Sequence, residues 1–361
     1  MVKLIEYKTD DGKSIEIHQL LAGREFARKS DDKQTQSIFN SAKSSANFCY
    51  CILVDNEACL VDPSWDVDGI FQYCRNDLNI SNISTTIYTH WHPDHVGGFM
   101  PTTVGGRLKI SGLPEVLENG CSTIYFGADE LEKIKQMHKL SDKDVEPFHL
   151  LKDNDQVMLN GINLDIISTP GHTVGSLCIY LSKANNDPKS IPMLITGDTL
   201  FIGSCGRFDQ NREGMKIFHS INRLSYLPDL TMVLPGHNYA GSNSKLGQEK
   251  LYNSAIMQGK QLMDRLNEIY GEATPPATLS RANTTSSSSM HSKNNFDNMI
   301  QLIPIKNYTE RALQIYNDML KEEKSCKVAN ANSTMYFANG FNYKCASCFP
   351  VIHVIGGDSK V

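Results

Sequence analysis

Four short apolar runs in this chain each lead into a histidine or an aspartate, and this pattern restricts the fold more than any other feature. The runs are STTIYTH (84–90), INLDIISTPGH (162–172), PMLITGD (192–198) and TMVLPGH (231–237). Their length and their β-branched residues predict β-strands. In the last three a glycine directly precedes the polar residue. We therefore expect a β-sheet whose strand ends display polar side chains along one edge.

The composition is that of a soluble globular protein. The chain has 361 residues, of which 40% are hydrophobic and 21% are charged. This length suits one large domain or two of moderate size, with enough apolar residues for a substantial core. The net charge is −5, which gives no reason to expect a nucleic acid or an anionic membrane as a partner.

The cysteines and the N-terminal residues bear on the cellular compartment. Residues 1–19 carry charges throughout, and the sequence has no apolar run of the length that a signal peptide or a membrane-spanning helix needs. The ten cysteines are scattered, some within strand-like runs such as CYCILV (49–54). This usage is typical of reduced, buried thiols. We therefore expect a cytoplasmic protein with no membrane partner.

The order of predicted elements favours an α+β fold. Strands predicted at 48–55 and 58–63 form a hairpin, and helical patterns follow at 127–138 and 214–225. The elements do not alternate strictly between strand and helix, so we expect a sheet-on-sheet core flanked by helices. The expected divisions are an N-terminal strand and variable segment (1–46), a catalytic domain (47–244), a helical extension (245–271), a low-complexity linker (272–297), a helix (298–325) and a tail (326–361).

The segment HWHPDHVGG, residues 90–98, has the composition of a metal site. Residues two apart on a strand share a face, so His90 and His92 can converge on one point. Pro93 stops a strand and sends Asp94 and His95 into a loop that can reach a second point. Imidazole and carboxylate groups are ligands for zinc, and also for iron or manganese.

Further candidate ligands stand at the other strand ends. His172, Asp198 and His237 each follow an apolar strand and a glycine. One histidine at a strand end is usually structural, but the repeated pattern predicts a metal cluster at this edge of the sheet. The remaining histidines match no motif, and we expect them to be ordinary: they are residues 18, 138, 149, 219, 291 and 353.

Between about residues 47 and 250 the chain resembles the metallo-β-lactamase-fold superfamily, in its H-x-H-x-D-H motif and in the later His, Asp and His. The resemblance implies an αβ/βα four-layer sandwich, here with a C-terminal helical extension, and a site between the two sheets. It implies two Zn²⁺ per chain, for which iron or manganese could substitute. The implied ligands are His90, His92 and His172 for one metal, Asp94, His95 and His237 for the other, and Asp198 as the bridge. Asp94 would also act in catalysis by orienting the nucleophile.

The stretch TGDTLFIGSCGRFDQ, residues 196–210, resembles glyoxalase II, the hydroxyacylglutathione hydrolase. That resemblance implies hydrolysis of S-(2-hydroxyacyl)glutathione or a related thiol ester by a metal-bridged hydroxide. Arg207 and Tyr239 would then hold the glutathione part of this small-molecule substrate, whose carboxylates suit an arginine. The basic residues with which that family grips glutathione further along have only candidate counterparts, in Lys245, Lys250 and Lys260.

Other functions remain open at this point. Asp209 stands where glyoxalase II usually has an aromatic residue, and CGRFDQ together with GHNYAG resembles the persulfide dioxygenases, which hold one iron and oxidise glutathione persulfide. A metallo-nuclease would share the fold, but the acidic chain lacks a basic stripe. A non-catalytic binding protein would not need the complete ligand set. The insertion at 99–121 is expected beside the pocket.

Overall fold

The computed structural model describes residues 2–9, 12–80, 82–101, 106–146, 148–182, 190–208 and 212–270. The expected linker (272–297), helix (298–325) and tail (326–361) lie outside the described residues, as do Asp209, His291 and His353.

The first sheet is built mostly from the N-terminal half of the chain. Within the described residues it has seven strands, in the order β1-β2-β3-β4-β5-β8-β9. The strands are β1 (Val2–Lys8), β2 (Ser14–Leu21), β3 (Phe48–Val54), β4 (Glu57–Val61), β5 (Asn82–Tyr88), β8 (Thr123–Gly127) and β9 (Phe148–Leu151). From β1 to β4 the neighbours are antiparallel, and from β4 to β9 they are parallel. The segment before residue 47 thus adds two strands to the same sheet.

The second sheet comes from the following part of the chain. In the described ranges it has six strands, in the order β10-β11-β12-β13-β14-β15. They are β10 (Gln156–Leu159), β11 (Ile162–Ser168), β12 (Leu177–Leu181), β13 (Met193–Gly197), β14 (Met232–Pro235) and β15 (Ser244–Lys245). The strands predicted in front of His90, His172, Asp198 and His237 are therefore present, as β5, β11, β13 and β14.

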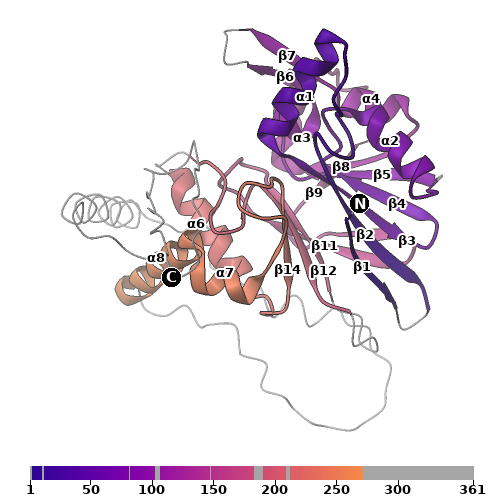
Figure 1. Ribbon diagram of the computed structural model, residues 1–361. Helices are drawn as coiled ribbons and strands as arrows, with labels where there is room; N and C mark the ends of the chain where they lie inside the picture. Colours follow the sequence, from indigo (N-terminus) through magenta and orange to yellow (C-terminus); the bar gives the residue numbers. More distant parts are fainter. Residues whose placement is uncertain are drawn as a thin grey trace, which may run out of the picture.

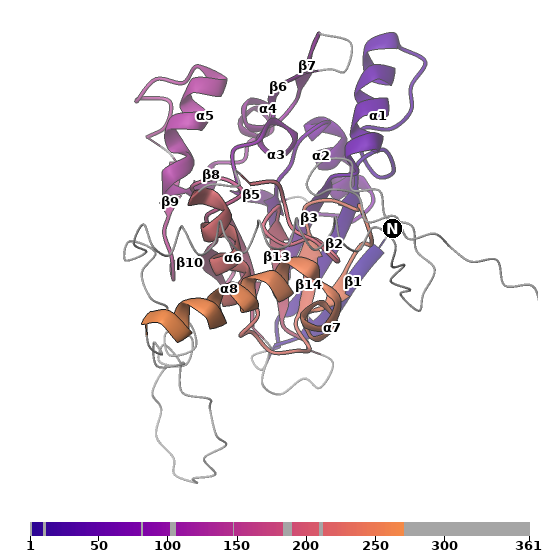
Figure 2. The same ribbon diagram turned by 90° about the vertical axis from the view of Figure 1, so that its left-hand side faces the viewer.

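Helices cover the outer face of each sheet. The first group is α1 (Lys33–Ser45), α2 (Val67–Asn76), α3 (Pro93–Val96), α4 (Leu113–Glu118) and α5 (Leu131–His138), and the second is α6 (Arg212–Leu224), α7 (Leu246–Tyr252) and α8 (Ser254–Tyr270). Figure 1 shows α1 to α4 beside the first sheet and the second group beside the second sheet. Figure 2 shows α8 crossing in front of the second sheet beside α6. The expected αβ/βα four-layer sandwich is confirmed.

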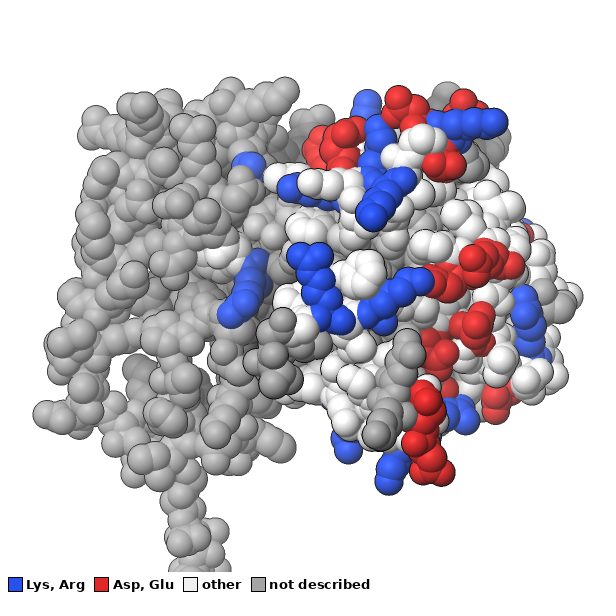
Figure 3. Space-filling model, turned by 90° about the horizontal axis from the view of Figure 1, so that it is seen from above, with Lys and Arg blue, Asp and Glu red and all other residues white. Residues whose placement is uncertain are grey.

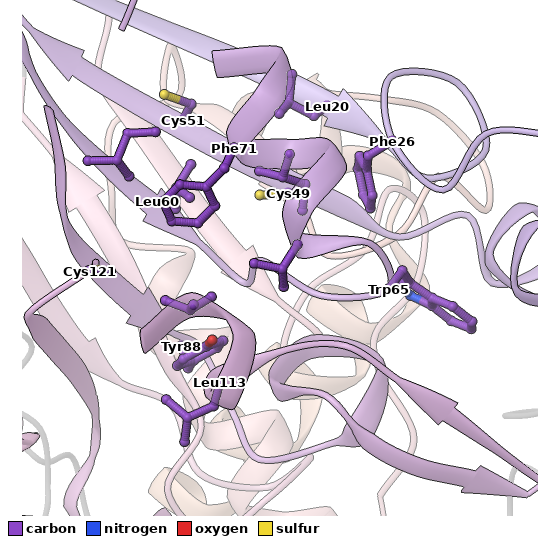
Figure 4. Packing of buried hydrophobic residues seen from close by; sticks show 14 of the residues in the cluster. Leu20, Phe26, Cys49, Cys51, Leu60, Trp65, Phe71, Tyr88, Leu113 and Cys121 are labelled. Carbon is purple, nitrogen blue, oxygen red and sulfur yellow. The ribbon is translucent and has the colours of Figure 1, made fainter. Parts of the chain in front are cut away.

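The alternation of side chains along β3 explains how the layers are held together. Tyr50 and Ile52 point into the apolar layer between the two sheets, where Ile179 and Ile195 of the second sheet meet them. Residues that alternate with these on the strand point the opposite way. Cys49 and Cys51 accordingly pack in the layer beneath α2, with Phe71 and Leu60 (Figure 4). Both faces of β3 are thus buried, which explains its unbroken apolar sequence.

The helical extension predicted at 245–271 is interrupted. α7 ends at Tyr252, and α8 begins at Ser254. Asn253 between them has an extended backbone, with ψ of 115°. Its side-chain Oδ1 accepts a hydrogen bond from the Ala255 amide, and its Nδ2 donates to the Phe201 carbonyl. The buried side-chain amide of Asn253 therefore ends α7 and caps α8. Such hydrogen bonds from a side chain to the backbone cannot be predicted from helical periodicity.

The insertion at 99–121 packs on the first sheet's side of the molecule, since its Ile110, Leu113 and Val116 belong to the apolar cluster that also contains Cys49 and Phe71. Strands β6 (Gly98–Pro101) and β7 (Arg107–Ile110) pair as a two-stranded sheet, and α4 follows. The hairpin projects at the top of the molecule in Figure 1. Seen from that side, Lys and Arg side chains gather over the middle of the described part of the face, with Asp and Glu side chains at its upper edge and to the right (Figure 3). Within the described residues, no helix combines the length and the apolar composition that crossing a bilayer requires.

Candidate metal centre

Three histidines from two separate loops form the first half of the site. The Nδ1 atom of His92 lies 3.1 Å from Nε2 of His90 and 2.9 Å from Nε2 of His172. His90 and His92 follow β5, whereas His172 follows β11 of the other sheet. Three nitrogens from the two sheets therefore converge on one point, as metal coordination requires.

Asp94, His95 and His237 form the second half. The Nε2 atoms of His95 and His237 lie 3.2 Å apart. Oδ2 of Asp94 lies 3.4 Å from Nε2 of His237 and 3.8 Å from Nε2 of His95. His95 and His237 are buried, whereas the Asp94 side chain keeps partial contact with solvent.

Asp198 lies between the two halves and faces both. Its Oδ2 is 3.5 Å from Nε2 of His172, and its Oδ1 is 3.3 Å from Nε2 of both His95 and His237. Oδ1 is buried and has no hydrogen-bond partner. A buried carboxylate oxygen without a donor is costly unless a cation neutralises it. The donor set and this orphaned oxygen fit a binuclear metal site.

The ring nitrogens turned away from the centre fix the histidine tautomers. His172 donates its Nδ1 proton to the Arg207 carbonyl at 2.6 Å, and His237 donates to the Ser45 carbonyl at 2.7 Å. His95 donates to Oδ2 of Asp62 at 2.9 Å. These bonds leave the lone pair of each Nε2 directed into the centre, which is the arrangement of metal-ligating histidines.

The local path of the motif differs from the prediction. β5 ends at Tyr88, so His90 and His92 lie beyond the strand and do not converge by sharing a strand face. His92 is instead the N-cap of α3, whose first residue is Pro93. Proline suits that position because its fixed φ matches the helix and its missing N–H would have no partner there. One helical turn then brings Asp94 and His95 to the second half of the site.

Burial and mutual charge set the protonation of these groups. Burial lowers the pKa of His90 well below its usual value and that of His92 to about 4, and the neighbouring rings add to both shifts. Burial also acts to lower the pKa of His95 and of His237, but the adjacent Asp198 and Asp94 carboxylates reverse this and raise both. Burial acts to raise the pKa of Asp198, yet the rings of His237 and His95 hold it well below its usual range.

Sequence reasoning missed the residues that orient the ligands. Asp62 accepts hydrogen bonds from the Thr89 amide at 2.7 Å, from the Thr89 hydroxyl at 2.6 Å and from His95. Asn47 donates from Nδ2 to Oδ2 of Asp94 at 3.2 Å, and its Oδ1 accepts from Trp65. Asp62 follows the apolar run ACLV, so it had the strand-end signal of the ligands without the preceding glycine. Nothing in the sequence connected Asn47 with Asp94.

The predicted substrate residues lie next to the site in different ways. Tyr239 stacks on the His237 ring, with centroids 4.7 Å apart, and is 51% exposed. Arg207 is exposed, and its backbone carbonyl holds His172. Lys250 donates to the Leu227 carbonyl and to Asp229, whereas Lys245 and Lys260 are exposed. The described histidines at 18, 138, 149 and 219 belong to neither half of the candidate metal centre.

Comparisons with known proteins bear on this arrangement. A model of the metallo-beta-lactamase superfamily matches residues 45–237. A probable hydroxyacylglutathione hydrolase of Schizosaccharomyces pombe is 29% identical over 233 residues, which cover 63% of this chain and 78% of that protein. A hydroxyacylglutathione hydrolase of Salmonella arizonae is 31% identical over 225 residues, or 61% of this chain and 68% of that protein. A metallo-beta-lactamase structure from Staphylococcus aureus has 26% identity and a TM-score of 0.46, and the match covers 64% of this chain and 65% of that chain.

Proposed function

Because the chain belongs to the metallo-beta-lactamase superfamily, we propose that it is a dinuclear zinc hydrolase of glutathione thiol esters, of the glyoxalase II type. The observation that carries this proposal is the position of Asp198. One of its oxygens faces His172 and the other faces both His95 and His237. A carboxylate that reaches two sets of histidines in this way can bridge two cations. His90, His92 and His172 would hold one ion, and Asp94, His95 and His237 the other.

Bound divalent cations supply an acidified water and polarise a carbonyl oxygen, which is the chemistry that thioester hydrolysis needs. The residues around them hold the ligands in place. Asp62 and the carbonyls of Ser45 and Arg207 fix three imidazoles with Nε2 directed inward. Asn47 donates a hydrogen bond to the carboxylate of Asp94, which in this proposal would orient the nucleophile.

The proposed substrate class rests on relatives and on two side chains. The Schizosaccharomyces pombe and Salmonella arizonae proteins are named as hydroxyacylglutathione hydrolases. Arg207 is exposed beside His172, where its guanidinium can reach a carboxylate of glutathione. Tyr239 lies against His237 with half of its surface exposed, and so offers a ring and a hydroxyl at the edge of the centre.

The test is the release of free thiol from S-lactoylglutathione by purified, zinc-loaded protein, with metal counted by elemental analysis. We expect two zinc ions per chain and thiol release that a chelator abolishes. Variant Asp198→Asn should bind less metal and lose activity. A protein that binds two zinc ions but releases no thiol from any glutathione ester would disprove the substrate class.

The persulfide dioxygenase alternative predicts a different result in the same assay. A single iron per chain, with oxygen uptake on glutathione persulfide and no thioester cleavage, would favour it. The dinuclear proposal is supported by the second half of the site, where donor atoms of Asp94, His95 and His237 lie 3.2 to 3.8 Å apart. The number of metal ions per chain therefore decides between the two functions.

A further inference from the structure

Glu130 is a buried carboxylate that belongs to neither half of the candidate site. It lies in a short turn, Ala128–Glu130, between β8 and α5, and it has no exposed surface. A buried carboxylate must be matched by hydrogen-bond donors or a cation. Glu130 accepts hydrogen bonds from a backbone amide of one loop and from a backbone amide and a hydroxyl of another.

Each oxygen of Glu130 serves a different loop. Oε2 accepts a hydrogen bond from the amide of Trp91 at 2.8 Å, and Trp91 lies between His90 and His92. Oε1 accepts from the Thr173 hydroxyl at 2.9 Å and from the Gly175 amide at 2.5 Å. Thr173 directly follows His172. One carboxylate therefore connects the two loops that supply the first three histidines.

The backbone of the loop that follows His172 lies close to the end of β8, beside Glu130. A Cβ atom on Gly175 would lie 2.7 Å from Cγ of Glu130, and a Cβ on Gly127 would lie 2.1 Å from the Gly175 carbonyl oxygen. The loop of the second sheet thus rests directly on the end of β8 in the first sheet. Since side chains are excluded there, the span between the loops is set by the backbone and by the length of Glu130.

We propose that Glu130 is a positioning residue that sets the spacing of His90 and His92 relative to His172, and so controls metal binding in that half of the site alone. This inference deepens the proposed function, since it concerns ligands of the proposed metals. The second half is held by other groups: Asp62 orients His95, and Asn47 orients Asp94. Loss of Glu130 should therefore affect the two halves unequally.

The experiment measures zinc affinity by calorimetry in two backgrounds and needs no substrate. In His237→Ala, which retains the first half, Glu130→Gln should weaken zinc binding by roughly 10- to 100-fold, as loss of an outer hydrogen-bond partner typically does. In His172→Ala, which retains the second half, the same change should leave the affinity within about twofold. Asp129→Asn, which alters an adjacent exposed carboxylate, is the matched control and should have no effect in either background.

Two more variants test whether the effect of Glu130 comes from its reach or from its charge, and guard against a variant that does not fold. Glu130→Asp keeps the charge but is one methylene shorter, so it should fail to span both loops and should weaken the first half as Glu130→Gln does. If Glu130→Gln does not fold, Thr173→Val removes one donor to Oε1 and should give a smaller loss in the same half. Equal weakening of both halves, or full affinity in Glu130→Asp, would overturn the proposal. Zinc binding that behaves as expected in a protein without thioesterase activity would refute the proposed function and leave this inference standing.

Discussion

The Nε2 atoms of His95 and His237 lie 3.2 Å apart. Each ring uses its Nδ1 proton elsewhere, His95 on Asp62 and His237 on the Ser45 carbonyl. Two unprotonated nitrogens at this distance repel each other, and a cation or a shared proton removes the repulsion. The pair is thus arranged to hold a positive charge, and protons and metal ions compete for it.

This competition predicts that acid removes metal from the two halves in sequence. The pKa values of His95 and His237 are raised above 6.5, since Asp198 outweighs their burial, whereas burial lowers the pKa of His92 to about 4. Groups with raised pKa take up protons at higher pH. As the pH falls, the ion on Asp94, His95 and His237 should therefore leave first. Dialysis against zinc at decreasing pH, followed by elemental analysis, should show a plateau at one ion per chain, and simultaneous loss of both ions would contradict this order.

Asp62→Asn should weaken metal binding without removing a ligand. The carboxylate of Asp62 accepts the Nδ1 proton of His95 and two hydrogen bonds from Thr89. An amide at this position can present an N–H toward one of these donors and would release the His95 ring. We expect zinc affinity to fall about 10- to 100-fold, chiefly in the half that contains His95. Calorimetry measures this, with the exposed Asp77→Asn as the control.

The sequence predicted which residues are candidate ligands, but not the local backbone that carries them or the residues that orient them. His172, Asp198 and His237 could be found because each stands directly after a strand and a glycine. That signal is local, so the sequence alone displays it. Asp62 also follows a strand, but no glycine precedes it, and so this orienting residue was missed. The expected shared strand face of His90 and His92 was wrong because β5 ends two residues before His90. Where Glu130 and Asn47 act depends on packing between distant segments, which periodicity does not report.

Asn253→Ala should destabilise the fold. Asn253 is fully buried, and its Nδ2 lies within hydrogen-bond distance of the Phe201 carbonyl, the Ser204 carbonyl and Glu249. Alanine would leave these acceptors without a donor and would remove the cap of α8 at Ala255. We expect a loss of about 2–4 kcal/mol in the free energy of unfolding. Urea denaturation measures this loss, and the exposed Asn76→Ala should cost far less.

Arg207→Ala should separate substrate binding from metal binding. The group that holds His172 is the backbone carbonyl of residue 207, which alanine retains. Metal content should therefore stay unchanged. If the guanidinium binds a glutathione carboxylate, its loss removes a charged hydrogen bond of about 1.5–3 kcal/mol, so KM should rise roughly 10- to 100-fold with little change in kcat.

The substrate can be varied to test the same contact from the other side. A thiol ester without the carboxylates of glutathione should be cleaved by the wild type and by Arg207→Ala with similar KM, because the side chain then has no anion to bind. Lys250→Ala is the matched control, since Lys250 already donates to Leu227 and Asp229 and should not affect KM. A fall in zinc content in Arg207→Ala, or an equal rise in KM for both esters, would show that Arg207 supports the loop of His172 rather than the substrate.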